Sequence, residues 1–319
     1  MTDLPKFVHI REEGLREGFQ IEPEIYPIEK RAALVEALAE TGLKHIQVAS
    51  LVNPKRVPQM ADTPELFARI KRRPDVAYTV LWLNKKGFLR ALDIPEADIE
   101  GGLFLSASDA FCRQNNGCSA DDLQEQQREM LDLYLEHDVP LKDIGIATAF
   151  GCYMEGDMPI ARIASLVRFA KELCDSRGVA PESLFLADTV GFGNPEDVRR
   201  RVGAVREIWP EVAVGLHLHD TRGVGPANFL AGLEMGVDRF DASLAGLGGC
   251  PFAGHKGAAG NVCTEDMVFM CQEMGIETGI DLDALIDCAR MAEELLDRPL
   301  TGKIMHSGSL GAYRGKAAE

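Results

Sequence analysis

Two histidines in residues 215–223 (GLHLHDTRG) have the spacing of a pair that acts together. Residues two apart in a β-strand project from the same face, so His217 and His219 are expected to point the same way. Two imidazoles side by side at the end of a strand supply half of a metal-ligand set. A pair of structural histidines in the core is the competing interpretation. Asp220, which follows directly, favours the metal site.

A second segment, residues 14–20 (GLREGFQ), places a cation beside a carboxylate just after an apolar run. Glu17 offers a carboxylate. Arg16 is a fixed cation that would hold a substrate carbonyl or carboxylate and stabilise a developing enolate oxygen. An ordinary surface ion pair remains the alternative on this motif alone.

A third segment, residues 245–261 (AGLGGCPFAGHKGAAGN), is rich in glycine, contains one thiol, Cys250, and ends on Asn261. Ordering glycine costs extra backbone entropy, so this many glycines are not expected in a loop that only connects two elements. It is typical of a lid that closes over substrate and carries a proton donor. A phosphate-binding loop is the rival, but the spacing G-x-x-x-x-G-K-[ST] is absent. An inert buried thiol is the alternative for Cys250.

Short β-rich runs that alternate with longer helical patterns must position these residues. The expected strands are residues 7–10, 45–50, 78–83, 103–106, 144–149, 184–188, 212–219 and 240–244. Eight strands, each followed by a helix, favour an α/β fold of the TIM (β/α)₈ barrel type. A doubly wound open sheet shares the alternation, so the count alone leaves it open. We expect residues 1–275 to form the barrel and residues 276–319 to form a short helical extension packed on it.

The carboxyl ends of barrel strands are where such enzymes place their active sites. The polar residues expected there are Arg16, Glu17, Gln47, Ser50, Asp188, His217 and His219, with the glycine loop beside them.

The composition limits the classes of function. The chain has 319 residues, of which 46% are hydrophobic, and a net charge of −16. This charge argues against binding to nucleic acid or to an anionic membrane surface. No apolar run is long enough to span a membrane, and the first twenty residues are too charged for a signal peptide. Eight scattered cysteines without a C-x-x-C pair fit a reducing compartment, so we expect a cytoplasmic protein.

Together the motifs resemble those of the 3-hydroxy-3-methylglutaryl-CoA lyase family, within the DRE-TIM metallolyase superfamily that also holds isopropylmalate and homocitrate synthases. The similarity runs from Val8 to about Lys303. It is dense at GLREGFQ, ASLVNPKRVPQM, ADTVGFG, HLHDTRG, and AGLGGCPFA…GAAGN followed by TEDMVFM. The resemblance implies a TIM barrel that binds Mg²⁺ or Mn²⁺. Its implied metal ligands are Glu17, His217, His219 and Asn261, an oxygen and imidazole set that suits a hard or borderline divalent ion.

The resemblance also implies catalytic roles. Arg16 matches the family's catalytic arginine, Asp188 a catalytic aspartate, and Cys250 the cysteine of a mobile loop that handles a proton. Asp188 or His217 would remove the hydroxyl proton, and Arg16 would stabilise the enolate left when the carbon–carbon bond breaks.

Gln47, Ser50 and Asn115 are the candidate substrate-binding residues of this site. The sequence therefore predicts a divalent-metal-dependent carbon–carbon lyase acting on a 3-hydroxyacyl-CoA or related hydroxy-acid substrate. A Claisen-type acyltransferase or 2-oxo-acid aldolase of the same superfamily, and a non-catalytic barrel, remain alternatives. A homodimer is expected from family habit.

The chain departs from the family pattern at several site positions. Glutamate replaces aspartate at Glu17. Gln47 stands where the family has a glutamate, Asp143 where it has an arginine, Gly145 where it has a tyrosine, and Phe185 where it has a serine. An aspartate inside the mouth would repel the free carboxylate of a glutaryl substrate. We therefore expect weak cleavage of 3-hydroxy-3-methylglutaryl-CoA and a preference for a neutral or apolar 3-substituent.

The position of Cys250 in the glycine loop predicts that Cys250→Ser folds normally but turns over far more slowly. Serine at Cys118 or Cys288, outside that loop, should be nearly silent. Steady-state kinetics on the three variants check this. Wild-type turnover by Cys250→Ser would show that its thiol is not the proton donor.

Overall fold

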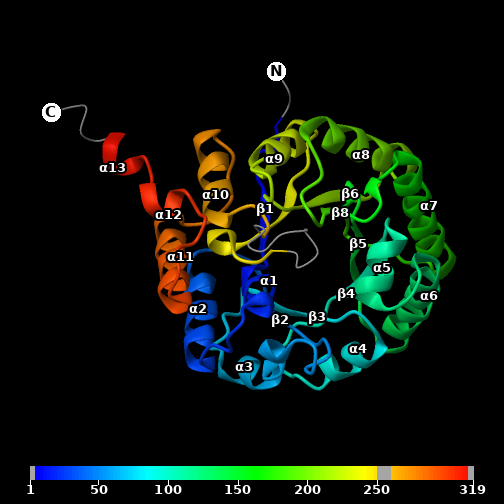
Figure 1. Ribbon diagram of the computed structural model, residues 1–319, viewed down its shortest axis with the longest axis horizontal. Coiled ribbons are helices and arrows are strands. Elements are labelled where there is room, and N and C mark those ends of the chain that lie inside the picture. Colours follow the sequence, from blue (N-terminus) through cyan, green and yellow to red (C-terminus); the bar gives the residue numbers. More distant parts are fainter. Residues whose placement is uncertain (1–3, 250–259, 315–319) are drawn as a thin grey trace.

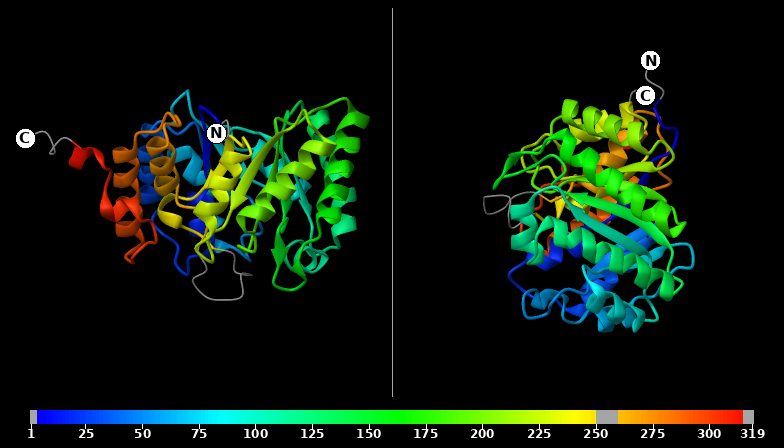
Figure 2. Two further views of the ribbon diagram at one scale, coloured as in Figure 1. Left: turned by 90° about the horizontal axis from the view of Figure 1, so that it is seen from above. Right: turned by 90° about the vertical axis from the view of Figure 1, so that its right-hand side faces the viewer.

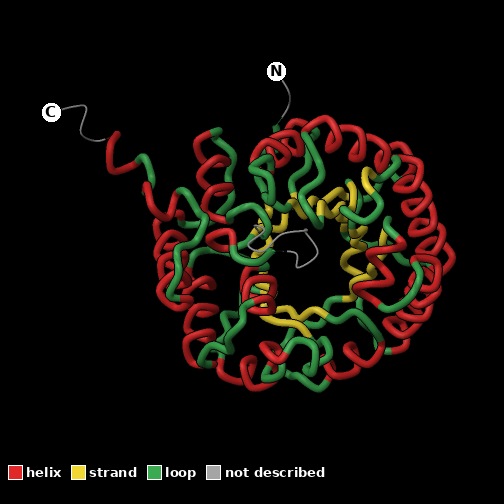
Figure 3. Tube along the Cα trace, viewed as in Figure 1, coloured by secondary structure: helices red, strands yellow, loops and turns green. Residues whose placement is uncertain are grey.

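The computed structural model describes residues 4–249 and 260–314. Eight parallel strands form one curled sheet in the order β3-β2-β1-β10-β9-β8-β5-β4 (Figures 1 and 3). Their bounds are β1 His9–Glu12, β2 His45–Ser50, β3 Ala77–Leu81, β4 Gly101–Ser106, β5 Leu141–Ala147, β8 Ser183–Asp188, β9 Ala213–Leu218 and β10 Arg239–Ala242. All eight expected strands are present, and the predicted (β/α)₈ class is confirmed.

Helices surround the sheet on its outer side (Figure 3). Those that follow the strands are α2 Ile28–Glu40, α3 Thr63–Arg69, α4 Lys85–Leu92, α6 Ala120–Glu136, α7 Ile160–Arg177, α8 Pro195–Ile208, α9 Gly225–Glu234 and α10 Thr264–Glu273. Shorter elements lie in the connections: α1 Gly14–Ile21, η1 Pro58–Met60, α5 Asp109–Asn116, the two-stranded β6 Gly151–Cys152 and β7 Gly156–Asp157, and η2 Leu244–Gly246.

The core lies between the sheet and this ring of helices, as the alternation in β5 illustrates. Ile144 and Ile146 are fully buried and belong to the main hydrophobic cluster. Asp143, just before Ile144, and Gly145, between the two isoleucines, face the barrel interior and are partly exposed. Side chains alternate between the two faces of a strand, so the barrel interior receives the polar and small residues.

The first strand begins two residues later than predicted. Residues 7–10 were expected from their apolar character, but β1 covers His9–Glu12, and Phe7 instead forms an isolated bridge with Glu277. The error arises because β1 carries charged residues, Arg11 and Glu12, which are depleted in ordinary strands. Here both are satisfied by partners from other elements.

The backbone ladder is open between β3 and β4, which are the two edges of the sheet in the described chain. Side chains bridge this gap. Trp82 Nε1 donates to Tyr134 Oη at 2.6 Å, and Tyr134 Oη donates to Gly102 O at 2.9 Å. Asp98 adds a second link, because its backbone N–H donates to Tyr78 O at 2.8 Å. At this edge Tyr134 of α6 joins the strands instead of a backbone ladder.

The C-terminal helices pack along one side of the barrel (Figure 2). They are α11 Leu282–Leu296, α12 Ile304–Ser307 and α13 Gly311–Arg314. Asp266 of α10 accepts the backbone N–H groups of Lys303 and Ile304 and so holds the start of α12. A division of the chain at residues 275/276 stays a prediction. None of the described helices combines the length and the apolar character needed to cross a lipid bilayer.

Tyr134→Phe should lower the free energy of unfolding by about 1–3 kcal/mol, because it leaves a buried indole N–H and a carbonyl without a partner. Equilibrium urea denaturation checks this, with Tyr313→Phe as the control, since Tyr313 is 61% exposed. Equal midpoints for Tyr134→Phe and the wild type would contradict the bridging role.

Candidate metal centre and active site

Helix α1 brings Arg16 and Glu17 over the end of β1 through a tight turn at Gly14. A Cβ on Gly14 would lie 2.7 Å from Glu12 Oε1 and 2.9 Å from Leu244 N, so glycine is required for this approach. Glu12, the last residue of β1, is completely buried. It accepts hydrogen bonds from Gly14 N, Leu244 N and Thr264 Oγ1 at 2.7, 2.9 and 2.5 Å. The start of α1 is thereby fixed to η2 and α10.

Glu17, His217 and His219 converge at the carboxyl end of the barrel. The two Nε2 atoms of the histidines lie 3.2 Å apart. Glu17 Oε1 lies 3.5 Å from His217 Nε2, and Glu17 Oε2 lies 3.5 Å from His219 Nε2. The geometry brings together two imidazoles and one carboxylate within metal-binding distance of one another.

Asn261 completes a fourth position beside the histidines. It forms an isolated antiparallel bridge with His219, and its Nδ2 lies 3.5 Å from His217 Nδ1. Asn261 Oδ1 and Glu17 Oε2 are both buried and have no hydrogen-bond partner among the described residues. Buried oxygen atoms are rarely left without a partner, and a divalent cation would satisfy both. The donor set fits the predicted Mg²⁺ or Mn²⁺, although the ligand roles stay predictions.

Asp241 of β10 sets the orientation of His217. Its Oδ2 lies 2.9 Å from His217 Nδ1, so the carboxylate holds the proton on Nδ1 and leaves Nε2 free to ligate. Burial lowers the pKa of His217, but the carboxylates of Glu17, Asp241 and Glu13 outweigh this and raise its pKa to about 9. A divalent cation at Nε2 would take the place of the second proton.

Arg16 is held by three acceptors. Its Nη1 lies 2.8 Å from Glu17 Oε1, its Nη2 pairs with Glu13, and its Nε donates to Gln47 Oε1 at 2.5 Å. Burial lowers the pKa of Arg16, but the neighbouring carboxylates of Glu17 and Glu13 raise it above its usual value, so it is always charged. Gln47, predicted to contact substrate, therefore orients Arg16 in this structure.

Glu13 and Arg11 are site residues that the sequence analysis did not identify. Arg11 donates to Asp241 from Nε at 2.8 Å and from Nη2 at 3.1 Å, and to Asp143 from Nη1 at 2.5 Å. The spacing of Glu13 and Arg16 at i and i+3 was the one available signal for Glu13. Nothing in the sequence pairs β1 with β5, so Arg11 was not predictable. Asp143, expected in the mouth of the barrel, is paired there with Arg11 and accepts a hydrogen bond from Ser183.

Asp188 lies at the end of β8, as predicted. Its two carboxylate oxygens accept the backbone N–H groups of Phe192 and Gly193 at 2.7 and 2.9 Å. Burial raises its pKa. Asp188 thus supports the turn after β8, and no hydrogen bond joins it to Glu17 or His217 in the described chain.

The remaining predicted residues are more scattered. Ser50 ends β2, is fully buried, and its Oγ has no partner among the described residues. Asn115 lies on α5, and its Nδ2 donates to Oδ1 of neighbouring Asn116 at 3.2 Å. This hydrogen bond does not involve any of the four predicted metal ligands. Cys250 lies outside the described residues.

The turn that leads into the glycine loop is held rigidly. Ala245 has a φ of 56°, a left-handed conformation that is strained for a residue with a Cβ. Its N–H donates to buried Glu265 Oε2 at 3.0 Å, and its carbonyl accepts from Thr301 N at 3.2 Å. The C-terminal extension thus positions one end of the predicted lid.

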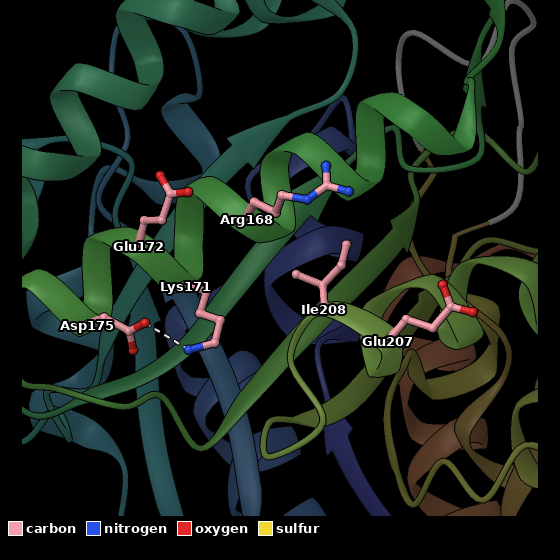
Figure 4. A pocket seen from close by; sticks show the side chains of 6 residues that line it. All are labelled: Arg168, Lys171, Glu172, Asp175, Glu207 and Ile208. Carbon is pink, nitrogen blue, oxygen red and sulfur yellow. Dashed lines mark hydrogen bonds and ion pairs between the residues drawn. The ribbon is translucent and has the colours of Figure 1, made fainter.

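A shallow groove on the outside of the barrel is unrelated to this centre. It lies between α7 and α8 (Figure 4) and is lined by Arg168, Lys171, Glu172, Asp175, Glu207 and Ile208. Lys171 and Asp175 pair at 2.8 Å, as expected of a solvated surface. None of the predicted site residues lines the groove.

Comparison with known proteins agrees with this geometry. The HMGL-like family profile matches residues 8–292. The chain belongs to the HMGL-like family. It is 36% identical to the mitochondrial hydroxymethylglutaryl-CoA lyase of Gallus gallus, over 94% of this chain and 97% of that protein. It is 37% identical to the 3-hydroxy-3-isohexenylglutaryl-CoA/hydroxy-methylglutaryl-CoA lyase of Pseudomonas aeruginosa, over 90% and 92%.

A solved structure of an HMG-CoA lyase from Acinetobacter baumannii, in complex with coenzyme A and 3-methylmalate, is also similar. It superposes with a TM-score of 0.86 at 38% identity and covers 98% of both chains. The predicted family, its barrel and its class, a lyase, are confirmed by these matches.

His219→Ala and, separately, His217→Ala should abolish divalent metal binding and activity together, because each removes one of few ligands. Elemental analysis after dialysis and Mn²⁺ titration by calorimetry check this, with His306→Ala as the control, since its side chain is 52% exposed. Wild-type metal occupancy in either site variant would contradict the ligand assignment.

Proposed function

We propose that this chain is a divalent-metal-dependent lyase that cleaves a 3-hydroxyacyl-CoA between C2 and C3. The products are acetyl-CoA, or a related enolate product, and a carbonyl compound. The observation that carries this proposal is the cluster of two imidazoles, one carboxylate and one amide beside the buried cation of Arg16. The relatives named above are lyases of this kind.

A bound Mg²⁺ or Mn²⁺ would supply Lewis-acid chemistry toward the oxygen atoms of the substrate. Glu17, His217, His219 and Asn261 would hold it. The roles of the protein are to fix these four groups, to exclude water and to provide the proton acceptor and donor. The hydrogen bond of His217 to Asp241 serves the first role by fixing the tautomer.

Arg16 would stabilise the negative charge that develops on the thioester oxygen. Three of its nitrogen atoms already hold Glu13, Glu17 and Gln47, so its guanidinium cannot rotate away. A guanidinium carries five N–H groups, which leaves donors for a substrate oxygen. A cation fixed before the reaction costs no reorganisation when charge develops.

Proton transfer would use two groups. Asp188 accepts the proton of the 3-hydroxyl as the C2–C3 bond breaks, and the electron pair of that bond passes into the thioester enolate. His217, the other predicted base, directs its Nδ1 proton to Asp241 and has its Nε2 assigned to the metal, so it has no nitrogen left to accept a proton. Cys250 then gives its thiol proton to C2. Burial raises the pKa of Asp188, which makes it a stronger base than an exposed carboxylate.

Several finer properties belong to this proposal. Similar proteins include both a mitochondrial enzyme, that of Gallus gallus, and a cytoplasmic one, the 3-hydroxy-3-methylglutaryl-CoA lyase of Danio rerio. A cytoplasmic location, the choice between Mg²⁺ and Mn²⁺, and a homodimer stay predictions. A Claisen-type acyltransferase or 2-oxo-acid aldolase would use the same enolate, and a screen of acyl-CoA thioesters against free 2-oxo acids separates these activities.

Arg16→Lys should retain metal but lower kcat by about 10²-fold, because lysine keeps the charge and loses the fixed planar geometry. Release of acetyl-CoA, followed by mass spectrometry with Mg²⁺ or Mn²⁺ present, provides the rate. Arg113→Lys is the control, since Arg113 is exposed on α5. An Arg16→Lys rate within twofold of the wild type would exclude Arg16 from the charge-stabilising role.

A further inference from the structure

Two cysteines flank the last turn of α5: Cys112 lies on the helix, and Cys118 follows its end. Gly117, between the helix and Cys118, has a φ of 77°, and its N–H donates to Arg113 O at 3.1 Å. A left-handed residue at the end of a helix turns the chain back, so the side chain after it packs on the last turn of the helix. The turn at Gly117 therefore brings Cys118 back to Cys112.

The two thiols are in contact. They are hydrogen-bond neighbours. Cys118 also packs against the small apolar cluster formed by Cys112, Ala120 and Leu123. Two sulfur atoms that already touch need only a short approach to reach the length of a disulfide bond, about 2.05 Å.

The segments on both sides of the pair are fixed to each other. Helices α5 and α6 lie side by side (Figure 1). Asp109, the first residue of α5, accepts Ala120 N at 2.9 Å and Arg113 Nε at 2.7 Å. Ser119 caps α6 through reciprocal hydrogen bonds with Asp122. These contacts hold the two cysteines together without a covalent bond.

The two sulfur atoms differ in their access to solvent. Among the cysteines within residues 4–249 and 260–314, Cys118 alone is partly exposed, and the others are buried. Burial, and then the neighbouring Cys118, raise the pKa of Cys112 to about 12. Cys112 therefore stays a thiol at neutral pH. An oxidant from solution reaches Cys118 first, and Cys112 is the thiol in contact with the product.

We propose that Cys112 and Cys118 are a modification site, at which a low-molecular-weight disulfide converts the two thiols into a reversible intrachain disulfide. Intracellular disulfides that form and break in this way are transient and redox-sensing. The site is separate from the metal residues and does not depend on the lyase function.

The exchange takes two steps. Cys118, as a thiolate, attacks one sulfur of the oxidant, whose S–S bond breaks and releases a thiolate. This thiolate takes the proton of Cys112, the Cys112 sulfur attacks Cys118, and the second thiolate leaves with the proton that Cys118 lost. Two protein thiols thus give two electrons and two protons to the oxidant, which becomes two thiols. The high pKa of Cys112 makes the second step slow, because the thiolate is the nucleophile.

Trypsin separates the two cysteines, because Arg113 lies between them. Cys112 falls on residues 91–113 and Cys118 on residues 114–128. Folded protein is incubated overnight with glutathione disulfide, denatured in an alkylating agent and digested. We expect mass spectrometry to find these two peptides joined by one disulfide, which dithiothreitol separates. Recovery of both peptides as alkylated thiols, or of a lasting glutathione adduct on Cys118 without the cross-link, would overturn the proposal.

Three variants test the order of attack. Cys112→Ser should stop at the glutathione adduct on Cys118, and Cys118→Ser should leave Cys112 unmodified, because Cys112 is buried. Cys288→Ser, on α11, is the control and should keep the cross-link. Thermal unfolding verifies that each variant folds. Modification of Cys112 in folded Cys118→Ser as fast as cross-linking in the wild type would show that the proposed order is wrong.

The ring closed by this disulfide contains Asn115, a predicted substrate-binding residue. Its effect on binding rests on the acyl-CoA substrate proposed above, and acetyl-CoA, which has no free thiol, is the probe. Calorimetry on Cys250→Ser, which lacks the thiol of the glycine loop, gives its Kd. Oxidation should raise this Kd about 2- to 10-fold, the cost of one hydrogen bond, because closing the ring displaces the last turn of α5.

The double variant Cys118→Ser/Cys250→Ser is the matched control, and the same treatment should leave its Kd unchanged. Dithiothreitol should restore the first Kd. An unchanged Kd in fully cross-linked protein would remove the link to substrate and leave the modification site standing. No binding of acetyl-CoA by the reduced protein would count against the proposed substrate instead.

Discussion

The burial of charge inside the barrel is the constraint on which the rest of the site depends. Arg11, Asp241 and His217 lie in register on the neighbouring strands β1, β10 and β9. A buried charge without a partner is costly, so the three must be paired in this order. The pairing fixes the tautomer of His217, and the side chain of Asp241 has no freedom to turn elsewhere. The geometry of the proposed metal site therefore depends on strand register as much as on the identity of the proposed ligands.

The same constraint explains the neutral residue at Gln47. Arg16 already faces two carboxylates, Glu13 and Glu17. Asp241 lies close enough to raise the pKa of Glu13 further, beyond the effect of burial. A third carboxylate on β2 would add repulsion within this buried group. An amide accepts the Nε hydrogen bond of Arg16 without adding charge, so Gln47 fits beside the two carboxylates.

Much of the architecture and the centre of the site was predictable from the sequence, because both depend on local patterns. The H-x-H spacing on β9 and the Arg16–Glu17 pair needed only the geometry of a strand and of a helix. Arg11 and Asp241 were missed because partners from other strands give them their role, whereas Glu13 had only the i, i+3 spacing to Arg16 as a signal. The open edge between β3 and β4 was missed for a related reason: Tyr134, on a helix, replaces the backbone ladder there. The role of Cys250 in the glycine loop stays a prediction from the sequence, since Cys250 lies outside the described residues.

Glu12 has a consequence for the order in which the protein is made. Its carboxylate joins groups 2, 232 and 252 positions away along the chain. Such a buried carboxylate is satisfied only when the last of these partners is in place. Ribosomes add about 5–20 residues per second, so roughly 12 to 50 s separate the synthesis of Glu12 from that of Thr264. During that interval Arg16 and Glu17 are already part of the nascent chain, but the later residues that fix the start of α1 have not been synthesised. Capture of the proposed metal ion would therefore be a late event in biosynthesis, after nearly the whole barrel has been translated.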